Sequence, residues 1–151
     1  MSRASHGLTC SALRVELERL RSLPDGTVTG IVHPDVSDCD ALVVVAHYRE
    51  DLTWLRKAKR PIAVVSKHNA NKSIPNVGGD VSSYLWFLSR VSHDALPSWL
   101  LMIHAHERHW HHPTSQLHSI GIALSQATLG FLNINHDRSL SMLRYYERCV
   151  T

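Results

Sequence analysis

The sequence has few cysteines and no long apolar run. Its three cysteines, Cys10, Cys39 and Cys149, are far apart, odd in number and without a Cys-x-x-Cys spacing. This pattern indicates neither a disulfide framework nor a thiolate zinc site, and it favours a reducing compartment. A membrane-spanning helix needs about 20 consecutive apolar residues, whereas charges interrupt the segment from Leu13 to Leu23. We therefore expect a soluble protein without a membrane span, with the cytoplasm favoured.

A strong charge of one sign is also missing. Sixteen Lys and Arg residues oppose thirteen Asp and Glu residues, and the basic residues are scattered along the chain. Nucleic-acid binding requires a basic patch or stripe, so the sequence predicts no nucleic-acid partner. The sequence also lacks a Walker loop, a Gly-x-Gly-x-x-Gly turn and a Gly-x-Ser-x-Gly elbow. P-loop, dinucleotide-fingerprint and hydrolase-elbow interpretations are therefore set aside.

Three continuous apolar runs, 41–46, 62–65 and 99–103, are typical of strands buried on both faces of a parallel sheet. Segment 27–40 indicates one short strand at most. Helical periodicity, with Asp80 as an expected N-cap, predicts the remaining elements. These are helices at about 11–23, 50–59, 80–91, 114–127 and 139–148, and a strand at 131–134. The expected fold is α/β, a single domain with a mostly parallel central sheet flanked by helices. It occupies 41–151 and follows an N-terminal helix and connector at 1–40.

Histidine is the outlier among the residues that are present. The chain has twelve histidines, and five lie within nine residues directly after the 99–103 run: His104, His106, His109, His111 and His112. Open parallel sheets bind ligands at the carboxyl ends of their strands. Strand alternation would place His104 and His106 on one face, with Glu107 as a third ligand for zinc, iron or manganese. One alternative is that the first two histidines bond to backbone while the others are solvated around Trp110. Another is that an imidazole acts as a hydrogen-bond donor or general base towards a bound ligand.

Two further loops carry polar side chains. Tyr48-Arg49-Glu50-Asp51 follows the first buried run, where Glu50 is best explained as a helix-capping residue and Asp51 is open to other roles. The second buried run is followed by an amide-rich basic loop, 67–72, and by 75–80, where a Gly-Gly pair lets the backbone approach a ligand. A simple turn followed by an N-cap explains these loops equally well.

Three blocks within 42–135 resemble the domain of unknown function 3431 family. They are Val44–Leu55, with a Y-x-E-D-x-x-W-L element, Pro75–Asp80 followed by Tyr84-Leu85, and Leu96–His112, with its H-x-H and W-H pairs. Gly130–Asn133 adds a weaker fourth. The family carries no established activity, so the resemblance implies kinship alone. Its members continue beyond the last matching strand. If the fold is that of a transferase, the resemblance implies that the part that binds the acceptor would be missing here.

The layout also resembles the nucleotide-binding half of a GT-A glycosyltransferase, with His104-Ala105-His106 where that fold has Asp-x-Asp. This resemblance implies that Asp51, Lys67 and Asn69 face a nucleotide sugar, and that His104, His106 and Glu107 lie near its diphosphate or metal. Asp51 and Glu107 are the candidate catalytic carboxylates. The candidate substrate-binding residues are Tyr48, Lys67, Asn69, Asn76, Asp80 and Trp110.

Three classes of function remain open on the sequence. The first is a metal-assisted transferase-like domain that binds a nucleotide sugar or carbohydrate. The second is a metal-dependent hydrolase, in which His104, His106 and another histidine hold an ion that activates water. The third is a non-catalytic binding protein that uses the surface around Trp110.

Overall fold

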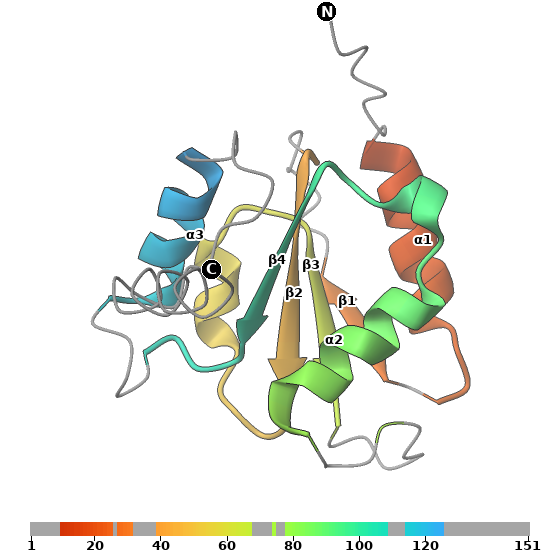
Figure 1. Cartoon of the computed structure of the whole chain (residues 1–151), viewed down its shortest axis with the longest axis horizontal. Helices are drawn as coiled ribbons and strands as arrows, with labels where there is room; N and C mark the ends of the chain where they lie inside the picture. Colours follow the sequence, from red (N-terminus) through yellow and green to blue (C-terminus); the bar gives the residue numbers. More distant parts are fainter. Residues whose placement is uncertain are drawn as a thin grey trace, which may run out of the picture. The chain divides into compact units, whose positions relative to one another are not determined.

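The computed structural model describes residues 10–25, 27–31, 39–67, 74, 78–108 and 114–125. The chain divides into two compact units, Met1–Ala105 and His106–Thr151. The strand predicted at 131–134 and the helix predicted at 139–148 lie outside the described residues. The described elements (Figure 1) are α1 (Cys10–Arg21), β1 (Val28–Ile31), β2 (Ala41–His47), the 3-10 helix η1 (Thr53–Lys57), β3 (Ile62–Ser66), α2 (Gly79–Arg90), the 3-10 helix η2 (His93–Ala95) and β4 (Trp99–His104) in the first unit, and α3 (Gln116–Ser125) in the second.

The first unit contains an open sheet, which in the described residues has four strands in the order β1-β3-β2-β4. β2 pairs in parallel with β3 on one side and with β4 on the other, whereas β1 pairs antiparallel with β3. The predicted α/β class is confirmed. The sheet is mixed, because the short strand expected within 27–40 is an antiparallel edge strand.

Burial on both faces is confirmed for β2 and β3, whereas β4, at the edge of the described sheet, is only partly buried. All five residues of β3 are buried, as are the first six of β2. One face of the sheet, which includes Leu42 and Val44, forms a single core with Leu13, Leu17 and Phe87 of α1 and α2. These two helices therefore cover that face, and Figure 1 shows η1 on the opposite side of the sheet. Each buried leucine contributes about 1.5–3 kcal/mol to this packing.

The helix predicted at 50–59 is wrong in length, because only Thr53–Lys57 forms a turn of 3-10 helix. The two acids predicted in its first turn lie before it and bond to their own loop. One oxygen of Glu50 accepts the backbone N–H groups of Tyr48 and Arg49. Asp51 accepts the N–H and hydroxyl of Thr53. These local bonds compete with helical backbone geometry.

α2 begins differently from the expectation. Gly78, with φ of 73°, is its N-cap and makes no side-chain capping bond, while Asp80 lies in the first turn. The predicted Asp80 N-cap is therefore wrong. Gly78 and Gly79 both have positive φ, a conformation that glycine adopts without a steric penalty. The Gly-Gly pair therefore turns the chain into the helix.

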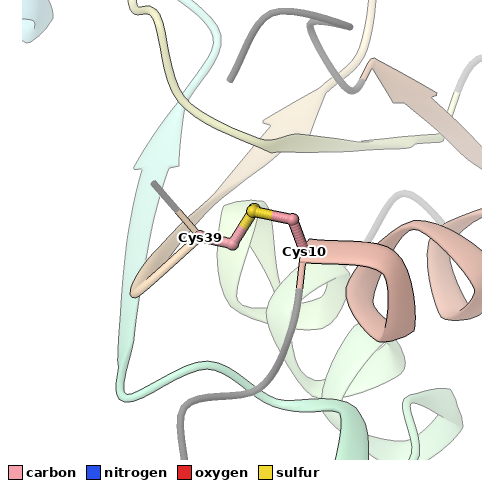
Figure 2. Close-up of a disulfide and its surroundings, with 2 residues drawn as sticks. All are labelled: Cys10 and Cys39. Atoms are coloured by element: carbon pink, nitrogen blue, oxygen red, sulfur yellow. A yellow bond between two sulfur atoms is a disulfide. The ribbon is translucent and has the colours of Figure 1, made fainter. Parts of the chain in front are cut away.

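Cys10 and Cys39 form a disulfide. Figure 2 shows that it joins the first residue of α1 to the segment directly before β2. The sequence had indicated no disulfide framework, because its three cysteines are far apart and odd in number. The two cysteines are 29 residues apart in sequence, and the fold brings their Cα atoms to 5.3 Å. Disulfides form and persist in oxidising environments, so the cysteines no longer support a reducing compartment.

In the part of the chain that the structure describes, no helix has the length and apolar character needed to cross a membrane.

Candidate functional site

The carboxyl ends of β2, β3 and β4 lie at one edge of the sheet, because these three strands are parallel. The direction of the chain across the sheet reverses at β2. From β2 the chain passes to β3 on one side, and α2 then carries it back across to β4 on the other side. In doubly wound sheets, ligands bind outside the carboxyl ends of the strands at such a reversal. This edge is therefore the candidate site.

His47 and Ser66 are the last residues of β2 and β3 and are partners in the parallel register. The Nδ1 atom of His47 lies 3.0 Å from the Ser66 hydroxyl oxygen, and its Nε2 atom lies 3.3 Å from the carbonyl oxygen of Glu50. Because a carbonyl can only accept, Nε2 of His47 is the donor in the contact with Glu50. Ser66 is 4% exposed, so this pair joins the two strand ends below the surface.

The loop after β2 is held by Glu50. One of its carboxylate oxygens accepts the backbone N–H of Tyr48 at 2.7 Å and that of Arg49 at 3.0 Å. The guanidinium carbon of Arg49 lies 5.0 Å from the centre of the Tyr48 ring, a cation–π contact. Both residues are exposed. The loop therefore presents a stacked aromatic and cationic pair at the end of the middle strand.

Asp51 is fully ionised near neutral pH. The Thr53 hydroxyl, 2.7 Å from its carboxylate, and then the Thr53 N–H lower the pKa of Asp51. An ionised, exposed carboxylate accepts hydrogen bonds and does not supply a proton. Asp51 is therefore suited to accepting hydrogen bonds from ligand hydroxyls, whereas its lowered pKa makes it a weak base.

Trp54 joins η1 to the end of β4. Its indole N–H donates to the carbonyl oxygen of Ala105 at 2.8 Å, and the bond is buried. Ala105 directly follows the last residue of β4. The position of the β4 end therefore depends on a side chain in the connection between β2 and β3.

Lys67 joins the end of β3 to the start of α2. Its backbone N–H donates to the carbonyl oxygen of His47 at 2.9 Å, and its ammonium group donates to the carbonyl of Gly79. Asp80 is exposed in the first turn of α2. Burial raises the pKa of the Tyr84 phenol, and the negative charge of Asp80 adds to this effect. Tyr84 therefore stays protonated at neutral pH.

The predicted metal ligands are divided between the two units. His104 is the last residue of β4, in the first unit, whereas His106 and Glu107 belong to the second. β4 ends at His104, so the strand alternation used to place the two imidazoles on one face does not extend to His106. No group of three or more His, Cys, Asp or Glu side chains in the described ranges could hold a metal ion. The described residues therefore do not fit a three-ligand centre, and we assign no chemical step to an ion.

Several predicted residues lie outside the described ranges. They are Asn69, Asn76, His109, Trp110, His111 and His112.

Residues 42–136 match the family described as "Protein of unknown function (DUF3431)". The chain belongs to this family. The comparison with curated proteins and the comparison with solved structures gave no match. The DUF3431 region starts within β2 and includes β3, α2, β4 and α3, so every element of the candidate site lies inside it. α1, β1 and the Cys10–Cys39 disulfide precede it.

The contact between His47 and Ser66 was missed in the sequence. A signal for it was present, because each is the first polar residue after a buried β-run. Parallel pairing with the runs in register places such residues side by side at one edge.

Proposed function

We propose that this DUF3431 domain binds a nucleotide sugar at the carboxyl edge of its sheet and is glycosyltransferase-like. The observation that supports the proposal is the reversal of chain direction at β2, with β3 and β4 parallel to it on either side. That arrangement favours a ligand site at this edge. The choice of ligand rests on the resemblance of the sequence layout to GT-A transferases, which is an analogy.

The side chains at this edge suit the parts of such a ligand. Lys67 follows β3 and supplies positive charge for a diphosphate. The ionised carboxylate of Asp51 accepts hydrogen bonds from sugar hydroxyls. The metal-dependent hydrolase requires an ion to activate water, and the described residues contain no group of three or more His, Cys, Asp or Glu side chains that could hold one.

Isothermal titration calorimetry with UDP and GDP sugars, with and without Mn²⁺, tests the proposal. We expect saturable heat with at least one nucleotide sugar and weaker binding in Asp51→Asn. The control is Asp94→Asn, an exposed aspartate in η2, before the amino end of β4. The absence of heat in every combination would contradict the proposal. Binding that is equal with and without Mn²⁺ would show that the nucleotide sugar binds without the ion.

A further inference from the structure

Building on the proposed function, we infer that Tyr48 and Arg49 form the surface on which the nucleobase of the ligand stacks. They lie in the loop directly after β2, at the point where the chain direction reverses.

The exposure of this pair separates it from a similar contact elsewhere in the same unit. Arg90 also lies over an aromatic ring, 5.9 Å from the centre of Trp86. Trp86 is 9% exposed and belongs to the core, so that arginine covers an interior side chain. Tyr48 is 36% exposed. The Tyr48 pair therefore lies at the surface of the unit.

The backbone beneath the pair is fixed before any ligand arrives. The Glu50 carboxylate binds the N–H groups of both residues, and the carbonyl of Glu50 is held by the His47 ring. That ring is in turn held by Ser66, which is buried at the end of β3. A surface that is already ordered loses less conformational entropy on binding. Glu50 is therefore a positioning residue for the pair.

The chemistry of the pair matches a nucleobase. Bases stack on aromatic rings and on the plane of an arginine guanidinium. Stacking is tolerant of base identity, because every base has a π-face. The pair is therefore expected to contribute affinity for the nucleotide part of the ligand and little discrimination between uracil and guanine.

Calorimetry of the full chain with UDP-glucose, GDP-mannose and inorganic pyrophosphate tests the inference. Pyrophosphate carries the charge but no base. We expect Tyr48→Ala to weaken binding of both nucleotide sugars about tenfold or more and to leave pyrophosphate binding unchanged. Tyr48→Phe should behave as wild type. Arg49→Ala should weaken nucleotide binding, whereas Arg90→Ala, the matched cation over a ring, should not.

The outcomes distinguish failure of the stacking inference from failure of the proposed function. If wild type and Tyr48→Ala bind a nucleotide sugar with the same affinity, the inference is overturned and the proposed function is not. An equal loss of pyrophosphate binding in Tyr48→Ala also overturns it, because the effect would then not be stacking. Wild type that binds neither nucleotide sugar overturns both. If Tyr48→Ala fails to fold, Tyr48→Leu, which keeps the bulk but not the aromatic face, decides by the same criteria.

Discussion

At the scale of single residues, Glu16 holds α1 to the rest of the first unit. One of its oxygens accepts the backbone N–H of Ser92 at 2.7 Å, and both of its oxygens pair with Arg19. Arg19 also donates to the carbonyl of Arg90 at 2.6 Å. The Arg19 guanidinium and then the Ser92 N–H lower the pKa of Glu16 below its usual 4.5, although burial opposes them.

This lowered pKa predicts how stability changes with pH. The folded pKa of Glu16 is below the unfolded value, so ionised Glu16 contributes stability above about pH 4.5 that is lost as the pH falls through the folded pKa. We expect Glu16→Gln to lower the free energy of unfolding at pH 7 by about 1–3 kcal/mol, and to have a smaller effect in acid. Urea unfolding between pH 3 and pH 7 measures both.

Glu18→Gln is the control for this prediction. Glu18 pairs with Arg21 at 3.6 Å, but both side chains are more than half exposed, so its loss should cost less than about 1 kcal/mol. Equal effects of the two substitutions at pH 7 would contradict the role given to Glu16.

At the scale of elements, the indole of Trp54 connects η1 to the end of β4. Trp54→Phe removes the donor and leaves the buried carbonyl of Ala105 without this bond. We expect a loss of about 1–3 kcal/mol in the free energy of unfolding. Hydrogen exchange should also be faster near the end of β4. Urea unfolding and exchange mass spectrometry are the measurements.

Trp86→Phe is the matched comparison. The indole N–H of Trp86 is buried and has no hydrogen-bond partner in the described structure, so removing it deprives no carbonyl of a bond. If Trp54→Phe proves no less stable than Trp86→Phe, the bond from Trp54 to Ala105 does not hold η1 and β4 together.

The elements also show why some local structure could be predicted and some could not. β2, β3 and β4 were predicted because continuous apolar runs are typical of buried strands, although β4 is only partly buried. The helix expected at 50–59 had the correct charges at both ends, but Glu50 and Asp51 bind their own loop. Charge patterning cannot tell a carboxylate that supports a helix from one that closes the turn before it.

At the scale of the whole molecule, the Cys10–Cys39 disulfide closes a loop that contains α1 and β1. A cross-link across 29 residues restricts the unfolded chain and stabilises the fold by about 3 kcal/mol. We expect Cys10→Ser with Cys39→Ser to lose about this amount. Urea unfolding with and without dithiothreitol measures it.

Reduction is the control for the disulfide prediction. Dithiothreitol should destabilise wild type and leave the double variant unchanged, and the thiol count of wild type should rise by two. A wild type whose midpoint is unaffected by full reduction would contradict the stabilising role.

The long-range features could not be predicted because they depend on where distant segments return. The spacing of the cysteines gave no sign of a pair, and only the fold brings their Cα atoms to 5.3 Å. The proposed metal set relied on β4 continuing through His106, whereas it ends at His104. In contrast, family membership was predictable, because the motifs of 42–136 are contiguous in sequence.

The covalent ring closed by Cys10 and Cys39 also determines which chain fragments separate after cleavage by a protease. A single backbone cut at any bond between these residues leaves the two fragments joined through sulfur. Such a nicked chain would migrate as one species on a denaturing gel and separate into two bands only after reduction.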